Sequence, residues 1–363
     1  MAKVVLENFY KYFGSVCAVK DLSLEISDGE FVVLLGPSGC GKTTTLRTIA
    51  GLESADEGNI YIDEQRVNDL KPADRDVAFM FQLYALYPHM TAYANIGYPL
   101  KTQGISKTQI DEEVRKMARV LQIDHILSKK PNALSGGDMQ RVALGRAMIR
   151  NPKVLLLDEP LGTLDAKLRE EMRSELKRLQ VESGVTTIFV THDQVEALSM
   201  GDRIVVMDKG ELQQAGTPPE VFNKPDNLFV ANFLGSPGMN LLECRYETEK
   251  GTLVIGKNDF TIGFPDHLKR LVSQFASSDE MVMGVRPGDV HIDNSPKENW
   301  IEADVYVFEH LGSENIISIK KGDSLLLSRT SPSFVCKPGD SVWLEFDPTR
   351  IHLFDKTTGK VYR

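Results

Sequence analysis

The segment FVVLLGPSGCGKTTTLRTIAG, residues 31–51, joins an apolar run, a glycine-rich loop and a stretch of helical character. The run FVVLLG is apolar throughout, as is typical of a strand buried on both faces of a parallel sheet. The loop GPSGCGKT, residues 36–43, fits the P-loop pattern G-x-x-x-x-G-K-[ST], which requires a strand before it and a helix after it. The segment therefore predicts an α/β fold that binds nucleotide phosphates.

The P-loop pattern also predicts what each of its residues does. Backbone N–H groups of the loop are expected to hold the β-phosphate, Lys42 to reach the β and γ oxygens, and Thr43 to bind Mg²⁺. The alternative, a chance match in a glycine-rich turn, is disfavoured because the strand and the helix are both predicted. The expected nucleotide-binding residues of this loop are Gly36, Pro37, Ser38, Gly39, Cys40, Gly41, Lys42, Thr43 and Thr44.

Strands and helices alternate in the first two thirds of the chain. VLLLDE (154–159), TTIFVT (186–191) and DRIVVMD (202–208) read as strands, and residues 166–183 read as a helix. This alternation predicts an α/β sheet with ligand sites at the carboxyl ends of its strands. Between about residues 90 and 152 the strand patterns vanish and amphipathic helices replace them, which predicts a helical subdomain.

After residue 235 the pattern changes to short β-rich runs separated by Gly, Pro, Asn and Asp, such as NIISIK and SVWLEF. Such spacing predicts a small barrel or sandwich. We therefore expect two domains, residues 1–235 and 236–363.

Two adjacent carboxylates, Asp158 and Glu159, follow the apolar run VLLL. Asp158 suits a Mg²⁺ contact, and Glu159 is then expected to polarise an attacking water as general base. The alternative is that Glu159 only caps or pairs near a loop. Adjacent carboxylates after a buried strand are costly without a cation, which favours the first interpretation.

Three further side chains are candidates on weaker grounds. His192 follows the strand TTIFVT, where it is expected to contact the γ-phosphate, although a structural histidine is an open alternative. Gln82 follows a strand and is expected to orient water or Mg²⁺, although loop glutamines usually meet solvent. Phe13, beside Tyr12, is expected to stack on adenine, although core packing is the commoner fate of an aromatic residue.

The stretch LSGGD, residues 134–138, forms a second predicted phosphate cradle. Ser135 offers a hydroxyl donor, while Gly136 and Gly137 allow close approach of the backbone at the start of a helix. One chain with one P-loop has no obvious use for a second cradle.

Charge and cysteine usage exclude several classes of protein. The net charge of −9 over 363 residues argues against a nucleic-acid binder. The four cysteines show no CxxC pair or metal-ligand spacing, which fits a reducing cytosol. The first residues show no apolar signal-peptide core, and the apolar runs are far shorter than the roughly twenty residues that span a bilayer. If the protein works at a membrane, we expect other chains to cross it.

Together these motifs resemble the nucleotide-binding subunits of ATP-binding-cassette (ABC) transporters. The resemblance covers the P-loop, the Q-loop Gln82, the signature LSGGD, the carboxylates after VLLL, the D-loop LGTLD (residues 161–165) and the switch His192. The segment VMGVRPGDV, around Arg286 and Pro287, resembles the regulatory domain of maltose-importer ATPases. The resemblance implies an α/β P-loop ATPase domain with a helical subdomain, followed by an all-β OB-like regulatory domain.

The resemblance also implies a mechanism and partners. ATP and Mg²⁺ would bind between two head-to-tail copies of this chain, or of a close paralogue, with Ser135, Gly136 and Gly137 holding the partner's γ-phosphate. Hydrolysis would drive two transmembrane permease subunits that import a sugar, polyol or glycerol-phosphate-type solute brought by a separate solute-binding protein. The chain would be peripheral, on the cytoplasmic face of the cell membrane, and would touch the permease through exposed aromatics near Gln82. Whether Tyr84, Leu86 and Tyr87 are instead core residues stays open.

Two departures from the family pattern stand out. Asp138 follows LSGG where glutamine is common, and Gly162 and Thr163 occupy the D-loop where SN or SA is usual. An acidic residue at a helix N-terminus remains favourable to the helix dipole. The rival function is a soluble cassette ATPase that acts on nucleic acid or ribosomes. It predicts two cassettes in one chain or a basic face, and this chain has one P-loop and a net negative charge.

Overall fold

A computed structural model describes residues 2–162, 164–247, 249–263, 268–269 and 280–363. The contacts divide the chain into two compact units, Met1–Pro219 and Glu220–Arg363, hereafter the N-terminal and C-terminal units. The predicted D-loop residue Thr163 lies outside the described residues.

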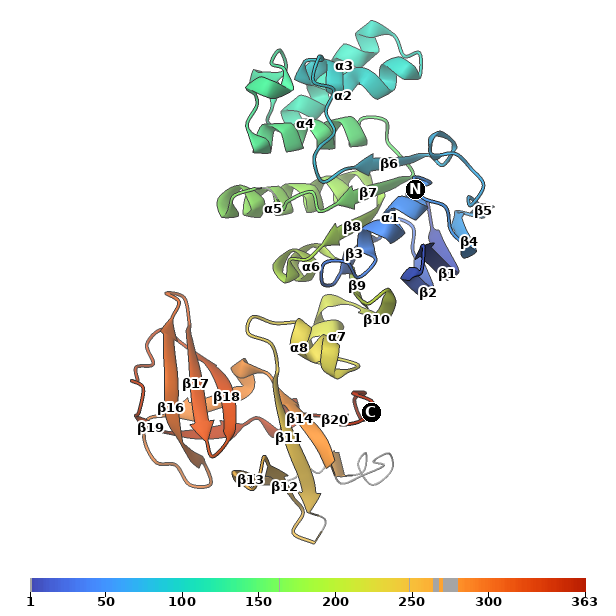
Figure 1. Ribbon diagram of the computed structural model, residues 1–363. Coiled ribbons are helices and arrows are strands. Elements are labelled where there is room, and N and C mark those ends of the chain that lie inside the picture. The colour runs from blue at the N-terminus through green and yellow to red at the C-terminus, as the bar shows by residue number, and fades with distance from the viewer. Residues whose placement is uncertain (1, 163, 248, 264–267, 270–279) are drawn as a thin grey trace. The chain divides into compact units, whose positions relative to one another are not determined.

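The described strands of the N-terminal unit form two sheets (Figure 1). One is antiparallel, with the order β2-β1-β4-β5. The other has the order β10-β9-β3-β8-β7-β6 and is parallel except for the β9–β10 hairpin. Their bounds are β1 (Val4–Phe13), β2 (Val16–Ile26), β3 (Phe31–Leu35), β4 (Glu57–Ile62), β5 (Gln65–Arg66), β6 (Val77–Met80), β7 (Val154–Asp158), β8 (Thr186–Thr191), β9 (Arg203–Asp208) and β10 (Glu211–Gly216).

The central strands are buried on both faces, as their apolar runs predict. All residues of β3, β7 and β8 are buried. The helix α1 (Lys42–Ala50) packs in one core with both sheets, since Leu46 and Ile49 share a cluster with Leu6 of β1 and Val32 of β3. The helices α5 (Ala166–Ser183) and α6 (Gln194–Met200) complete the α/β arrangement. This packing fixes the start of α1 beside the carboxyl ends of β3 and β7.

The predicted helical subdomain is present. The helices α2 (Ala92–Thr102), α3 (Lys107–Val120) and α4 (Gly136–Met148) lie together beyond the edge strand β6 (Figure 1). Thr91 and Ser106 cap α2 and α3 by accepting backbone N–H groups with their hydroxyls, which sets where these helices begin. The span agrees with the predicted limits of about 90 and 152.

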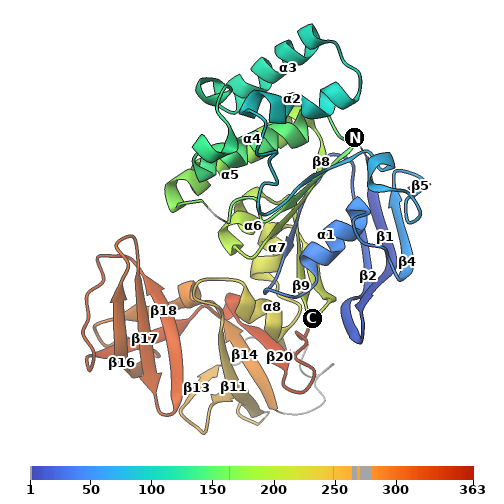
Figure 2. The ribbon, with the colours of Figure 1, turned by 45° about the horizontal axis from the view of Figure 1, so that its top comes forward.

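The described part of the C-terminal unit forms two antiparallel sheets around one core (Figure 2). Their orders are β13-β12-β11-β14-β20 and β15-β19-β16-β17-β18. The strands are β11 (Asn240–Glu247), β12 (Thr252–Ile255), β13 (Phe260–Gly263), β14 (Glu280–Val285), β15 (Val290–Asp293), β16 (Ile301–His310), β17 (Asn315–Lys321), β18 (Ser324–Thr330), β19 (Ser341–Phe346) and β20 (His352–Asp355).

The division between the units differs from the boundary expected at residue 235. It falls within the helix α7 (Pro218–Asn223), and α8 (Leu228–Phe233) belongs to the C-terminal unit. There, Ala231 of α8 shares an apolar cluster with Val282 and Phe354. Arg286, 7% exposed, donates hydrogen bonds to the carbonyls of Phe222, Ala231 and Leu234. These long-range contacts carry no short sequence signal, so the composition change at 235 marked the start of the β pattern rather than the edge of the packed unit.

Candidate functional site

The P-loop joins β3 to α1 in a conformation that needs glycine. Gly41 has φ of 103°, and a Cβ at Gly36 would lie 2.2 Å from the carbonyl oxygen of Met207. Nζ of Lys42 donates hydrogen bonds to the carbonyls of Gly36 and Pro37, each at 2.8 Å. The lysine side chain therefore folds back onto the first residues of the loop. Ser38 and Gly39 are exposed at its tip. The loop is therefore held by hydrogen bonds from Lys42 and leads into the start of α1, where the helix dipole favours an anion.

Cys40, the remaining loop position, points inward. It is 2% exposed, and burial raises the pKa of its thiol. Its backbone N–H donates to the carbonyl of Pro37 at 3.3 Å. Any contribution of Cys40 to phosphate binding is therefore through the backbone. Thr44, in the first turn of α1, is half-buried.

Thr43, in the first turn of α1, contacts Asp158 at the end of β7. Oγ1 of Thr43 donates a hydrogen bond to Oδ1 of Asp158 at 2.8 Å. Asp158 is 3% exposed, and burial raises the pKa of its carboxyl above the usual value, with the Thr43 hydroxyl partly opposing the shift. The positive charges of Arg47 and Lys42 also oppose the rise, but they do not cancel the effect of burial.

This pair fits a magnesium ion by its chemistry. Mg²⁺ prefers oxygen ligands and is commonly held by one or two carboxylates together with substrate phosphates. Thr43 and Asp158 supply neighbouring oxygens, and a divalent cation would relieve the burial cost of the carboxylate. Gln82 could add only its Oε1, because its Nε2 already donates to Glu159.

Glu159 is held by the other two candidates. Nε2 of Gln82 donates to its Oε2 at 3.0 Å, and Nδ1 of His192 lies 3.4 Å from its Oε1. The backbone of Glu159 has φ of 45°, and its N–H donates to the carbonyl of Val190. A positive φ in a non-glycine residue is costly and often marks a functional position. The structure thus brings Gln82, Glu159 and His192 together from three loops.

The second cradle is separate from the P-loop of its own chain. Ser135 caps α4, and its Oγ accepts the N–H of Asp138 at 3.2 Å while Oδ2 of Asp138 accepts the N–H of Ser135 at 3.3 Å. Among the described residues no hydrogen bond or ion pair joins Ser135, Gly136 or Gly137 to the P-loop. A Cβ at Gly137 would come 2.3 Å from Cδ2 of Leu168 in α5, so this position tolerates only glycine without repacking.

The N-terminal aromatics are exposed rather than buried. Phe13 is 48% exposed and Tyr12 is 38% exposed, which disfavours the alternative of core packing. Nζ of Lys11 lies 5.3 Å from the ring centroid of Phe13. Phe13 is therefore accessible to a flat partner such as an adenine ring, without any contact here that identifies one.

The segment after Gln82 is mixed in its exposure. Leu83 and Tyr87 are 81% and 37% exposed, whereas Tyr84 is 9% exposed and Leu86 is half-buried. Both expectations for this segment therefore hold in part: Tyr84 is a packing residue, while Leu83 and Tyr87 face outward. Within the described ranges, no helix combines the length and hydropathy needed to cross a bilayer.

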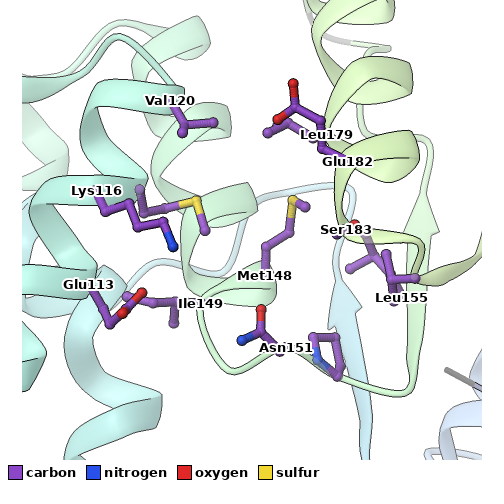
Figure 3. A pocket seen from close by; sticks show the side chains of 13 residues that line it. Glu113, Lys116, Val120, Met148, Ile149, Asn151, Leu155, Leu179, Glu182 and Ser183 are labelled. Carbon is purple, nitrogen blue, oxygen red and sulfur yellow. The ribbon is translucent and has the colours of Figure 1, made fainter.

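A cavity of about 430 Å³ lies elsewhere, between α3, the end of α4, and α5 (Figure 3). Met148, Leu155 and Leu179 form apolar parts of its lining, and Glu113 and Lys116 project from α3. None of the predicted site residues lines it. The cavity lies between the helical subdomain and the sheet, and it does not extend to the P-loop.

Sequence reasoning missed Arg169 and Glu196, which lie directly behind the site. Oε2 of Glu196 accepts a hydrogen bond from Oγ1 of Thr191 at 2.5 Å, next to His192. Arg169 donates to the carbonyl of Leu164 at 3.0 Å. Neither residue belongs to a short motif. The one available signal was the position of Glu196 in the first turn of α6, next to the buried residues Ala197 and Met200.

Comparison with known proteins identifies the domains. Residues 19–162 match the family model "ABC transporter", residues 235–290 the "MalK OB fold domain" and residues 283–354 the "TOBE domain". A solved dimeric cassette, MJ0796 in a post-hydrolysis state bound to ADP and Pi, aligns with a TM-score of 0.55 and 35% identity over 59% of this chain and 98% of that chain.

Curated relatives match over nearly the full length. The trehalose/maltose import ATP-binding protein MalK of Thermococcus litoralis is 49% identical over 99% of both chains. The oligosaccharides import ATP-binding protein MsmX of Bacillus subtilis is 44% identical over 99% of both chains. The sn-glycerol-3-phosphate import ATP-binding protein UgpC of Psychromonas ingrahamii is 43% identical over 99% of this chain and 95% of its own. With a P-loop beside paired carboxylates and a C-terminal OB and TOBE region, the chain therefore belongs to the ATP-binding subunits of ABC transporters, of the MalK type, and is an ATPase.

Proposed function

We propose that this ATPase energises an ABC importer for a sugar, polyol or glycerol-phosphate-type solute. One observation carries the catalytic part: Gln82, Glu159 and His192 converge beside the Thr43–Asp158 pair at the carboxyl ends of the sheet strands. The solute class is supported by the names of the full-length relatives, which are import proteins for trehalose/maltose, oligosaccharides and sn-glycerol-3-phosphate.

In the proposed reaction, ATP binds with its β- and γ-phosphates over the P-loop. Backbone N–H groups from Gly36 to Thr44 and the ammonium of Lys42 contact the phosphate oxygens. Phe13 offers its exposed ring to the adenine. Mg²⁺, held by Thr43 and Asp158 with Gln82 nearby, supplies charge neutralisation when bound.

Glu159 acts on the attacking water. Its carboxylate accepts a water proton as the water oxygen bonds to the γ-phosphorus and the bond to the β–γ bridging oxygen breaks, giving ADP and phosphate. Gln82 holds one carboxylate oxygen, and His192, 58% exposed, stands beside the other, from where it reaches the γ-phosphate. The general base is thus oriented by two neighbours before substrate arrives.

The signature residues complete the site of a second copy. Ser135, Gly136 and Gly137 start a helix, where an anion is favoured, and make no hydrogen bond or ion pair to their own P-loop in the described chain. Two copies of the chain, or this chain and a close paralogue, would pack head to tail and hold each ATP between a P-loop and a partner's signature. ATP then closes the dimer and hydrolysis reopens it. The dimeric cassettes with similar folds support this arrangement.

The moving dimer would drive two transmembrane permease subunits. The exposed side chains of Leu83 and Tyr87, close in sequence to Gln82, offer a surface for a short helix of a permease. A separate solute-binding protein would deliver solute to the permease, and this chain would stay peripheral on the cytoplasmic face of the membrane. The net charge of −9 opposes the rival role on nucleic acid or ribosomes.

Affinity purification from membranes tests the proposal. We expect the tagged chain to bring down two hydrophobic subunits, and the complex in vesicles to couple ATP hydrolysis to solute uptake. The matched variant Lys42→Ala should assemble with the same subunits and abolish both hydrolysis and uptake. Recovery of ribosomes in place of hydrophobic subunits would support the rival.

A further inference from the structure

A buried carboxylate stands behind the switch histidine. Glu196 in α6 is 3% exposed, and its Oε2 accepts the hydroxyl proton of Thr191 at 2.5 Å. Burial raises the pKa of Glu196 above the usual glutamate value. A carboxylate removed from water in this way needs a cation or further donors to remain in place.

Arg169 in α5 is the cation that faces this carboxylate. Its Nε lies 4.0 Å from Oε1 of Glu196, and its Nη1 lies 3.4 Å from Oδ2 of Asp193. Its Nη2 donates to the carbonyl of Leu164, in the D-loop, at 3.0 Å. One guanidinium therefore touches both the D-loop and the start of α6. The planar fork of an arginine allows the two hydrogen bonds, to Asp193 and to Leu164, to be made while the charge stays close to Glu196.

The residues on either side of His192 are fixed by the same cluster. The hydroxyl of Thr191 accepts the N–H of Asp193 at 2.9 Å while it donates to Glu196. Oδ1 of Asp193 in turn accepts the N–H groups of Val195 and Glu196, at 2.7 and 3.1 Å, and so caps α6. The side chain of His192 is itself 58% exposed, and in the described chain its ion-pair contact is with Glu159. Its position relative to Glu159 is therefore set by its neighbours.

We propose that Arg169 is a positioning residue, which with Glu196 ties the D-loop to the His192 loop and so holds His192 against Glu159. The proposal rests on the proposed function, in which Glu159 and His192 act on ATP. Its physical basis is a chain of hydrogen bonds from the Leu164 carbonyl through Arg169 and Asp193 to Thr191. His192 stands between Asp193 and Thr191 in the sequence, so both of its covalent neighbours belong to this chain.

The first test is steady-state ATP hydrolysis by the full-length Arg169→Gln variant. Glutamine keeps a donor for the Leu164 carbonyl but removes the cation shared by Asp193 and Glu196. We expect kcat to fall about tenfold or more, since a misplacement of about 1 Å can cost on the order of a hundredfold, and the KM for ATP to stay within about twofold. The matched control is Arg178→Gln on the same helix, because the ion pairs of Arg178 in the described chain are with Glu175 and Glu182 of that helix, away from Asp193 and Glu196. This control should leave both constants unchanged.

The second test separates positioning from general destabilisation. We expect Arg169→Gln to lower kcat little further in a His192→Ala background, because the residue acts through His192. Nitrogen resonances of the His192 ring, followed by NMR without nucleotide, should shift in Arg169→Gln and in Glu196→Gln but not in Arg178→Gln. Arg169→Lys keeps the charge without the planar fork, and we expect it to melt near wild type while kcat stays reduced.

Other outcomes overturn the proposal in distinct ways. Additive losses of kcat for Arg169→Gln and His192→Ala, with unchanged His192 resonances, would show that Arg169 does not act through His192. Full turnover of Arg169→Lys would show that a positive charge at this position suffices, and that the planar guanidinium is not needed to connect the D-loop to the His192 loop. If Glu159→Gln and His192→Ala both turn over normally, the proposed function fails instead, whatever Arg169 does.

Discussion

Oγ1 of Thr43, in the first turn of α1, donates to Oδ1 of Asp158, at the end of β7, across 2.8 Å. The two residues are brought together because α1 packs between the sheets, where Leu46 and Ile49 join the core. The contact places a hydroxyl and a carboxylate together next to the P-loop, at the start of α1. It also leaves the Asp158 carboxylate buried, with a pKa that stays above its usual value despite the nearby charges of Arg47 and Lys42.

The buried carboxylate predicts a pH-dependent cost to stability in the protein without nucleotide. The folded-state pKa of Asp158 is raised above its ordinary value of 3.8, so the folded chain holds this proton more tightly than the unfolded chain. Stability from this group is therefore present below pH 3.8 and is lost as pH rises through the folded pKa. We expect the melting temperature of Asp158→Asn to exceed that of wild type at neutral pH, with a gap that closes toward low pH. Mg·ATP should raise the melting temperature of wild type and not of the variant. A gap that widens at low pH would contradict the assignment.

Glu159→Gln should separate binding from hydrolysis. The amide retains the size of the carboxylate but cannot take a proton from water. Loss of a general base typically costs on the order of 10² to 10⁴ in rate. We expect this variant to bind ATP as wild type does and to accumulate as a closed dimer, which size-exclusion chromatography with ATP would detect. Turnover near the wild-type rate would remove Glu159 from this role.

Mixed dimers should reveal whether the signature serves another chain. Lys42→Ala damages the P-loop half of a site, and Ser135→Arg fills the signature half with a long side chain. Each homodimer carries two damaged sites, so we expect each to be nearly inactive. In the heterodimer one site collects both defects, while the other combines the intact P-loop of the Ser135→Arg chain with the intact signature of the Lys42→Ala chain.

The measurement is occluded nucleotide in heterodimers purified through two tags, together with the membrane subunits. We expect one ATP per heterodimer, against almost none for either homodimer. Hydrolysis is measured alongside, because coupling between sites can suppress turnover even where one site is whole. An intact heterodimer that retains no more nucleotide than the homodimers would refute the head-to-tail arrangement.

Truncation should respond to the division within α7. Every predicted nucleotide-binding residue lies before residue 219, so we expect chains ending at Gly216 or at Gly235 to bind Mg·ATP. The longer chain keeps α8 without Val282 and Phe354, its apolar partners in the C-terminal unit. It should therefore aggregate more readily on heating, as light scattering would show, although it contains more of the native sequence. Equal solubility of both chains would argue against the assignment of α8 to the C-terminal unit.

Local motifs predicted much of this molecule because each depends on residues that are close in sequence. FVVLLG, VLLLD and TTIFVT appear as buried strands, and the P-loop stands between β3 and α1 as its pattern requires. The helical subdomain and the β-rich C-terminal region were predicted from a change of period and of turn residues. In each case the residues that form the sequence pattern are the same neighbouring residues that form the helix, strand or turn.

Relationships between distant residues were beyond reach of the sequence. Nothing around Gln82 indicates that its amide would meet Glu159, since that contact depends on how β6 and β7 pair. Arg169 reads as one of many charges on a polar helix until α5 and α6 are placed side by side. The boundary after residue 219 likewise depends on where Arg286 finds its carbonyl partners.

The capping box of Ser135 and Asp138 bears on how tightly two copies could associate. Fixing the backbone of one residue costs roughly 1–2 kcal/mol of conformational entropy, and a surface that orders only on contact loses that amount from its affinity. Here Asp138, in place of the family's usual glutamine, holds the first turn of α4 within one chain by two reciprocal hydrogen bonds. The entropy cost of ordering the first turn of α4 therefore arises when the chain folds and not when two chains associate. The first turn of α4 would already be ordered when a second chain binds. The free energy of the contact with nucleotide would then stabilise the dimer without being offset by the entropy of ordering this turn.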